Sequence, residues 1–254
     1  MTLTLTPLPG IPIVNPGDDL ASLIISALER MQIDLEAGDI LVLAQKIVSK
    51  SEDRFINLAA VSPSRKALAL GEQVDKDARL IELILQESKS ILRTRLGTII
   101  VEHRLGFVCA NAGIDHSNVN TESDSDEWVL LLPENPDYSS KLIRSKLEEW
   151  CCQTIGILII DSHGRAWRLG TVGVAIGISG LPGLEDLRGD PDLFGRTLRV
   201  TQVGAADELA AAASLVMGQA GEGTPVVHVR GFPYALREGS LEELIRPEQE
   251  DMFR

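Results

Sequence analysis

The sequence predicts a fold that mixes β-strands with α-helices, and three observations lead to this prediction. The runs at 40–44 and 155–160 are wholly apolar, which is typical of strands buried inside a sheet. Apolar and small residues recur at helical spacing elsewhere, most clearly at 203–217. Hydrophobic residues make up 44% of the chain and aromatic ones only 4%, so Leu, Ile, Val and Ala must form the core. The 254 residues suffice for one large domain or two modest ones.

The first half of the chain alternates strand and helix signals. Asp18 or Asp19 can cap a helix, because a short acidic side chain accepts hydrogen bonds from the free N–H groups at a helix start. The residues at 91–103 alternate charged and apolar character and predict a hairpin with 107–110. We expect strands at 3–8, 40–44, 91–103 and 107–110, an apolar extended segment at 10–14, a strand or turn at 57–62, and helices at 19–31, 63–70 and 75–90.

Polar loops separate the elements of the second half. The segment 121–127 is acidic and should be exposed, whereas the helix expected at 139–154 should turn Leu142 and Trp150 inward. Glycine recurs through 170–183, a strand-like run in which the missing side chains let neighbouring backbones approach closely. We expect strands at 129–132, 155–160, 170–183 and 226–229, and helices at 139–154 and 203–217.

Charge and cysteine content exclude several classes of protein. The net charge of -13 argues against a nucleic-acid partner, since phosphate backbones bind basic surfaces. Cys109, Cys151 and Cys152 have neither zinc-site nor disulfide spacing, which fits a reducing compartment. The first residues lack a signal-peptide pattern, and no run reaches the roughly 18 apolar residues of a membrane span. We therefore expect a cytoplasmic protein with no membrane partner.

The loop at 111–120 is the first candidate site. It follows the apolar run 106–110 and carries the carboxylate of Asp115, several carboxamides and an imidazole. A buried strand positions such a loop, and the loop supplies the polar groups. Asn118, three residues after Asp115, can point the same way in one turn of helix. The alternative is an ordinary turn whose Asn and Asp side chains bond their own backbone.

Two further loops carry chemistry that complements Asp115. Asp161 and Ser162 follow the apolar run 155–160, so a second buried strand delivers a carboxylate at its end. The loop 218–224 is rich in glycine and can offer backbone N–H groups to phosphate. Two carboxylates with water and phosphate oxygens suit Mg²⁺ or Mn²⁺. A metal–nucleotide site is the functional hypothesis that these loops support.

Other patterns leave alternatives open. Lys46 and Lys50 stand four residues apart, either as a solvated pair or with one of them bound to phosphate. His116 and His163 adjoin the two acidic positions and are candidates for proton transfer. The sequence has no P-loop, no dinucleotide fingerprint in a strand–turn–helix setting and no Gly-x-Ser-x-Gly elbow. Trp128, Trp150 and Trp167 are interpreted as core or interface residues.

Several segments form a more specific pattern, for example GDILVLAQKIVSK at 38–50 and NAGIDHSNV at 111–119. The others are 10–14 with 17–20, 159–165 with 167–168, 192–196, and 206–213 with 215–219. Together they cover nearly the whole chain, and they resemble the coenzyme F420-0:L-glutamate ligase (F420 gamma-glutamyl ligase) family. The resemblance implies an α+β fold of this family's own type, in two lobes within a single 1–254 domain, without a C-terminal flavin domain and assembled as a homodimer.

The resemblance also implies an activity. A ligase of this family uses GTP to convert the terminal carboxylate of coenzyme F420-0 into an acyl phosphate. The amine of L-glutamate then attacks, giving F420-1 with release of GDP and phosphate, and a second cycle gives gamma-linked F420-2. The expected cofactors are Mg²⁺ or Mn²⁺ and the monovalent K⁺. Two other interpretations stay open: an amide ligase for another acceptor, and a nucleotide-binding regulatory module without turnover.

The resemblance assigns roles by motif. Asp115, Asp161 and Lys50 are the expected catalytic residues. A hydroxyl is retained at Ser162, where the family often has Thr, and Gly221 stands where an acidic residue often follows the alanine. The implied metal ligands are Asp115, Asp161, Ser162 and Gln219. The implied nucleotide-binding residues are Gly10, Ile11, Pro12, Ile13, Gln45, Lys50, Asn118, Met217, Gly218, Gln219, Ala220, Gly221, Glu222, Gly223 and Thr224.

Overall fold

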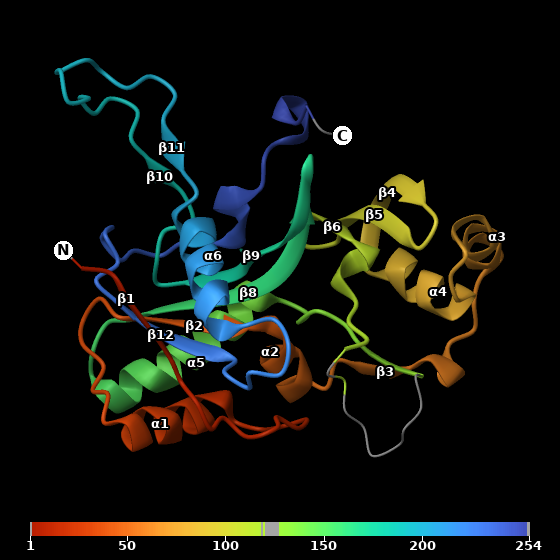
Figure 1. The fold of residues 1–254 in the computed structure, drawn as a ribbon, viewed down its shortest axis with the longest axis horizontal. Helices are drawn as coiled ribbons and strands as arrows, with labels where there is room; N and C mark the ends of the chain where they lie inside the picture. Colours follow the sequence, from red (N-terminus) through yellow and green to blue (C-terminus); the bar gives the residue numbers. More distant parts are fainter. Residues whose placement is uncertain (1, 118, 120–126, 253–254) are drawn as a thin grey trace.

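A five-stranded sheet forms the centre of the protein (Figure 1). The computed structural model describes residues 2–117, 119 and 127–252. Strands β2 and β8 run parallel, and the other neighbouring pairs of the sheet are antiparallel. The prediction of a mixed α+β fold is confirmed. In spatial order the strands are β1 (Thr4–Pro7), β12 (Val226–Arg230), β2 (Ile40–Ala44), β8 (Gly156–Arg165) and β9 (Arg168–Ser179).

The two apolar runs lie in the middle of this sheet, as predicted. Each residue from Ile40 to Leu43 is fully buried, because β2 has a paired strand on both sides and helices over both faces. The strand β8 begins at Gly156 but continues to Arg165, in a long hairpin with β9. Asp161 therefore does not end a strand, and that expectation was wrong. Asp161 is the first residue of β8 beyond the buried core, and most of the strand that follows it is exposed.

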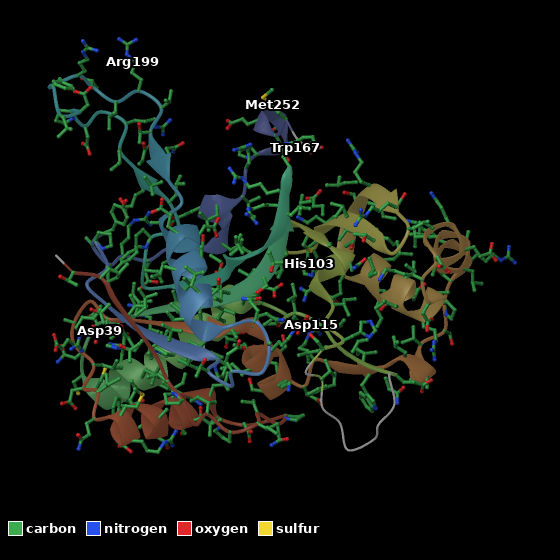
Figure 2. The ribbon with its side chains drawn as sticks, viewed as in Figure 1. Asp39, His103, Asp115, Trp167, Arg199 and Met252 are labelled. Atoms are coloured by element: carbon green, nitrogen blue, oxygen red, sulfur yellow. The ribbon has the colours of Figure 1, made fainter. Side chains whose placement is uncertain are left out.

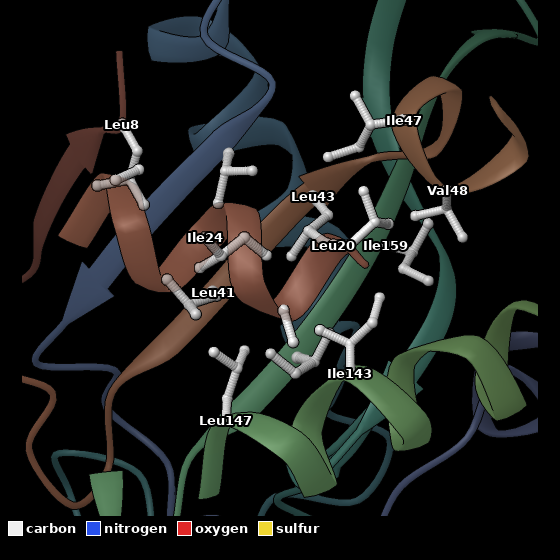
Figure 3. Packing of buried hydrophobic residues seen from close by; sticks show 14 of the residues in the cluster. Leu8, Leu20, Ile24, Leu41, Leu43, Ile47, Val48, Ile143, Leu147 and Ile159 are labelled. Atoms are coloured by element: carbon white, nitrogen blue, oxygen red, sulfur yellow. The ribbon is translucent and has the colours of Figure 1, made fainter. Parts of the chain in front are cut away.

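Three helices cover the sheet. Helix α1 (Leu20–Met31), which Asp19 caps as expected, packs with α5 (Pro136–Cys151) on one face (Figure 3). Helix α6 (Ala205–Met217) packs on the other face, where a second apolar cluster lies. It approaches β9 closely, since a Cβ atom on Gly173 would lie 2.5 Å from the Ala210 carbonyl oxygen. The expected role of glycine in this strand is thus confirmed at Gly173.

Helix α5 differs from its prediction. It begins at Pro136, with Asn135 as the cap, and so starts earlier than expected. Ile143 and Leu147 are buried, but Leu142 and Trp150 are 48% and 39% exposed. The expectation that these two residues point inward was wrong. Helix α5 packs against the rest of the protein along one side only, and Leu142 and Trp150 lie outside that buried side.

A smaller group of elements packs beside the central sheet around its own apolar cluster (Figure 1). One helix of this group was predicted at 75–90 and is shorter in the structure. Asp75 has a left-handed φ of 53° and ends the preceding helix, and Ser88 already begins a strand. The elements are β3 (Phe55–Asn57), α3 (Arg65–Val74), α4 (Ala78–Gln86), β4 (Ser88–Arg95), β5 (Thr98–His103), β6 (Val108–Ala110) and β7 (Trp128–Leu130), with 3₁₀ helices η1 (Leu58–Ala60) and η2 (Asn111–Gly113). Helix α2 (Gln45–Ser51) instead packs Ile47 and Val48 into the cluster of the central sheet.

An arm projects from the molecule between β10 (Glu185–Asp186) and β11 (Gln202–Val203) (Figure 1). Its side chains Leu193 and Phe194 are 99% and 87% exposed. Beyond α6 and β12, the chain carries the short 3₁₀ helices η3 (Leu241–Leu244) and η4 (Glu248–Glu250). None of the helices in the described residues is long and apolar enough to span a bilayer.

Candidate active site

A cavity of about 670 Å³ lies where the central sheet meets the smaller group of elements. Figure 2 shows Asp115 at this boundary. The parallel pairing of β2 with β8 explains the location. Ala44 pairs with Ile160, so the next residues lie side by side: Gln45, where β2 ends and α2 begins, and Asp161, within β8. The three loops predicted to carry chemistry all contribute to the cavity wall.

The backbone around Asp115 is held on both sides. The N–H of Asp115 donates to the Leu130 carbonyl at 2.9 Å, and the N–H of Leu130 donates back at 2.9 Å. The preceding turn needs left-handed conformations, with φ of 54° at Ala112 and 65° at Gly113. A Cβ atom on Gly113 would lie 2.7 Å from Cδ1 of Leu132, so glycine alone fits this position. The turn thereby directs Asp115 into the cavity.

Three charged or polar groups surround the Asp115 carboxylate. The Lys46 Nζ atom lies 2.7 Å from Oδ2, and Gln45 Nε2 donates a hydrogen bond to the same oxygen. Burial raises the pKa of Asp115, the Lys46 charge lowers it and the negative charge of Asp161 raises it again, so that the pKa lies above its usual value. The two carboxylates are therefore close enough to repel each other.

The Asp161 carboxylate is held from its own strand. His163 Nε2 lies 3.0 Å from Oδ2, and the N–H of Ser162 donates to Oδ1 at 2.7 Å. Burial disfavours the charged form, but the hydrogen bond and charge of His163, followed by the Ser162 N–H, hold the pKa of Asp161 below its usual value. Asp161 is thus kept ionised.

The loop after α6 closes the third side of the cavity. The Ser162 Oγ atom donates to Oε1 of Gln219 at 2.7 Å, which joins strand β8 to this loop. Thr224 Oγ1 donates to the Met217 carbonyl at 2.9 Å and ties the far end of the loop to the helix. Gly218 has a φ of 80°, which lets the chain turn sharply out of α6.

The cationic side of the cavity comes from helix α2. Lys50 lines the cavity together with Lys46, one helical turn earlier. Burial lowers the pKa of Lys50, and the charge of Lys46 lowers it further. The ammonium groups of Lys46 and Lys50 and the carboxylates of Asp115, Asp161 and Glu222 thus line one cavity, so positive and negative charges are both available to a ligand.

The donor set fits a hard divalent cation. Within the described residues, no group of three His, Cys, Asp or Glu side chains could hold a metal by itself. Asp115 and Asp161 are nevertheless mutually repelling carboxylates on one cavity, with the hydroxyl of Ser162 and the amide oxygen of Gln219 beside them. Oxygen donors of this kind, completed by water and phosphate, suit Mg²⁺ or Mn²⁺. The residues present therefore fit the predicted metal.

The cavity wall contains most of the residues singled out from the sequence. Gly10 is an exception: its carbonyl accepts a hydrogen bond from Arg30 at 2.9 Å, and it does not line the cavity. Asn118 lies outside the described residues. The predicted residues that line the cavity are Ile11, Pro12, Ile13, Gln45, Lys50, Asp115, Asp161, Ser162, Met217, Gly218, Gln219, Ala220, Gly221, Glu222, Gly223 and Thr224.

Two residues have a larger part in this geometry than the sequence indicated. Lys46 was weighed only as one of a pair with Lys50, but it forms the ion pair with Asp115. His163 was one of two candidate histidines, and it bonds Asp161. Residues two apart on a strand share a face, so the spacing of Asp161 and His163 was a usable signal.

Comparison with known proteins agrees with this geometry. Residues 10–231 match the sequence model of a family described as F420-0:Gamma-glutamyl ligase. The chain belongs to the F420-0:gamma-glutamyl ligase family. The matched range includes every element of the cavity wall, from Ile11 to Pro225. The resemblance found in the sequence is thus confirmed.

Relatives in this family align over the full chain. A protein of Methanothermobacter thermautotrophicus named coenzyme F420:L-glutamate ligase is 48% identical over 256 residues, which cover 100% of both chains. A protein of the same name from Methanopyrus kandleri is 46% identical and aligns over 100% of this chain and 98% of its own. One from Archaeoglobus fulgidus is 41% identical, with coverage of 100% and 97%. The chain is thus similar, along its whole length, to proteins named coenzyme F420:L-glutamate ligase.

Proposed function

We propose that this protein is a GTP-dependent ligase that joins L-glutamate to coenzyme F420-0. Membership of the F420-0:gamma-glutamyl ligase family and the names of its full-length relatives support the substrates. The observation that carries the proposal is the cavity itself. It combines three carboxylates, two lysines and a glycine-rich loop, and such groups can hold a divalent ion and offset the charge of a nucleoside triphosphate.

The proposed reaction has two steps. The terminal carboxylate of F420-0 attacks the γ-phosphorus of GTP, the bond to the β-phosphate oxygen breaks, and GDP leaves. The resulting acyl phosphate is attacked at its carbonyl carbon by the amine of L-glutamate, which loses a proton, and phosphate leaves as the amide forms. A second cycle on the γ-carboxylate of the added glutamate gives F420-2.

The chain's own residues meet the main electrostatic difficulty of the first step. A carboxylate must approach a phosphate, and both are anions. The ammonium groups of Lys46 and Lys50 face the cavity and offset that repulsion. Asp115, Asp161, Ser162 and Gln219 would hold Mg²⁺ or Mn²⁺. When bound, such an ion supplies charge neutralisation to the transferred phosphoryl group.

The remaining wall of the cavity suits a nucleotide. The segment Ile11 to Ile13 and the α2 residue Gln45 flank the lysines, while the 217–224 loop offers backbone N–H groups. Positioning of the amine against the acyl phosphate then supplies much of the rate acceleration, because it turns a bimolecular step into one within the site. We also propose K⁺ as a monovalent activator, as the family resemblance implies.

Self-association is part of the same proposal. We infer a two-lobed homodimer that uses the exposed apolar side chains of the arm and of the β8–β9 hairpin tip. Phe194 and Leu193 on the arm, and Trp167 and Leu169 at the tip, are each at least 87% exposed. Each projection thus carries two large exposed apolar side chains, and exposed apolar surface of this kind is typical of interaction sites. A separate apolar cluster in the smaller group of elements supports two lobes, and the free thiols support a cytoplasmic location.

The activity test uses the purified chain with F420-0, L-glutamate, GTP and Mn²⁺, followed by mass spectrometry of the F420 product. We expect a mass gain of one glutamate that depends on GTP. Turnover of GTP that depends on a different acceptor would instead favour a related amide ligase. Nucleotide binding without turnover under all these conditions would favour a regulatory module.

A further inference from the structure

The side chain of Glu222 folds back onto its own glycine-rich loop. Its Oε2 atom accepts a hydrogen bond from the Ala220 N–H at 2.8 Å. The carboxylate also lies against Gly218, where a Cβ atom would be only 2.3 Å from Cδ of Glu222. A Cβ atom at position 218 would therefore displace the Glu222 side chain from this position. The position of the Glu222 carboxylate therefore depends on both Ala220 and Gly218.

One N–H group of the loop, that of Ala220, donates directly to this carboxylate. The backbone of Ala220 first, and then those of Glu222 itself and of Gln219, hold the pKa of Glu222 below its usual value. Successive backbone N–H groups that point at one anion form the kind of concave site that proteins use for phosphate. Here the anion is supplied by the chain.

The same carboxylate lines the candidate active-site cavity. It faces the cavity that also contains Asp115, Asp161 and Lys50, and no cationic side chain is bonded to it among the described contacts. Glu222 is exposed, so burial does not force it into this position. The hydrogen bond from the Ala220 N–H explains its position.

We propose that the Glu222 carboxylate occupies the place of a phosphate group in the nucleotide-free protein, and that nucleotide binding displaces it from the loop. This inference rests on the proposed function, because it takes the loop to be a phosphate-binding element. A phosphate carries more charge than a carboxylate and also gains from the nearby lysines, so it wins the exchange. Displacement consumes part of the binding free energy, and Glu222 thus sets the nucleotide affinity.

The first test concerns the free protein and uses amide hydrogen exchange resolved by residue. In Glu222→Ala, the Ala220 amide should exchange faster than in the wild type, because its acceptor is gone. The matched control is Glu149→Ala, which removes a similar exposed carboxylate from α5, outside the cavity. An Ala220 amide that exchanges equally fast in Glu222→Ala and wild type would overturn the proposal, whatever the nucleotide does.

The second test measures affinity by calorimetry for GDP with Mg²⁺ and for inorganic pyrophosphate. We expect Glu222→Ala and Glu222→Gln to bind both about two- to fivefold more tightly than wild type, a scale set by exposed charge contacts. Glu149→Gln should bind like wild type. Unchanged or weaker binding by the Glu222 variants contradicts the proposal.

The two probes separate this inference from the proposed function. If pyrophosphate binds more tightly to the Glu222 variants while GDP binds to no form of the protein, the loop is an anion site and the GTP-dependent function is wrong. If neither probe binds to any variant, the displacement model is wrong as well.

Discussion

His163 Nε2 lies 3.0 Å from Oδ2 of Asp161, and the two residues stand two apart on the same face of β8. The ring of His163 also contacts Phe107, at 5.2 Å between ring centroids. Phe107 stacks on the buried His103 at 5.1 Å. Aromatic contacts from the smaller group of elements thereby hold the imidazole that orients one of the cavity carboxylates.

We predict that His163 acts as a positioning residue for Asp161. The variant His163→Ala should lower Mn²⁺ affinity about tenfold, the usual effect of removing a group that orients a metal ligand. His163→Gln, whose amide can reach the same oxygen, should recover part of that affinity. Electron paramagnetic resonance of free Mn²⁺ measures this without turnover. Equal Mn²⁺ affinity in His163→Ala and wild type would show that the contact has no positioning role.

Asp115 and Asp161 should each be essential to turnover. We expect Asp115→Asn and Asp161→Asn to reduce the glutamate-ligation rate at least about a hundredfold, because the amide retains the shape but loses the charge that holds a divalent ion. Thermal unfolding should show that both variants remain folded. Asp53→Asn, an exposed change of the same kind, is the control. Near-native ligation by either cavity variant with Mg²⁺ rules out the metal assignment.

Lys50 should contribute to nucleotide affinity. Lys50→Ala is expected to weaken GDP binding about tenfold, since the lost ammonium is a charge-assisted donor to phosphate. Lys66→Ala removes an exposed lysine from α3 and serves as the matched control. Calorimetric titration gives both values. If Lys50→Ala and Lys66→Ala bind GDP with the same affinity, Lys50 does not bind phosphate.

Acid stability should depend on Glu87, which lies away from the cavity. Burial opposes its ionisation, but the neighbouring His103, a hydrogen bond from Arg104 and the charges of Arg104 and Arg54 lower its pKa to about 2. A pKa below the unfolded value stabilises the fold above that value, and the stabilisation is lost as pH falls from about 4.5 towards 2.

The corresponding variant is Glu87→Gln. It should lower the free energy of unfolding at neutral pH by about 2 kcal/mol, because two arginines lose their partner. Its stability should also fall less steeply than wild type through the acid range. Urea unfolding at several pH values provides the comparison, with the exposed Glu72→Gln as control. Parallel pH profiles for Glu87→Gln and wild type would refute this prediction.

The arm should govern self-association. Phe194→Ser together with Leu193→Ser removes two large exposed apolar side chains without touching the core. We expect the sedimentation coefficient to fall to that of a monomer at concentrations where wild type is dimeric. A wild type that sediments as a monomer at all concentrations tested would contradict the homodimer proposal directly.

Local sequence patterns predicted much of the fold. The apolar run of β2 identified a central strand because both of its faces are buried, and Asp19 identified the start of α1 because capping is a local interaction. The patterns were weaker where neighbours decide the outcome. Asp75 ends helix α3 by a left-handed turn, whereas its spacing predicted that it begins the next helix. Leu142 and Trp150 look inward by spacing but have no element packed over them.

The site shows the same division. The loops around Asp115, Asp161 and Gln219 were identifiable because polar groups follow apolar strands. Their convergence depends on the parallel pairing of β2 with β8, which places Gln45 beside Asp161. Nothing local indicates that pairing, and therefore the Lys46–Asp115 ion pair at 2.7 Å was not predicted. Family resemblance identified the loops as one site, and the three-dimensional structure adds which side chains meet.

The central claim is that the cavity joins glutamate to F420-0 through an acyl phosphate. The most direct measurement uses F420-0 whose terminal carboxylate carries heavy oxygen, incubated with GTP, Mn²⁺ and L-glutamate. The phosphate released is then analysed by mass spectrometry. We predict that one phosphate is released for each amide formed and that it carries one heavy oxygen. The carboxylate oxygen that attacked the γ-phosphorus stays bonded to phosphorus when the amine displaces phosphate. Unlabelled phosphate accompanying amide formation would contradict the acyl-phosphate mechanism.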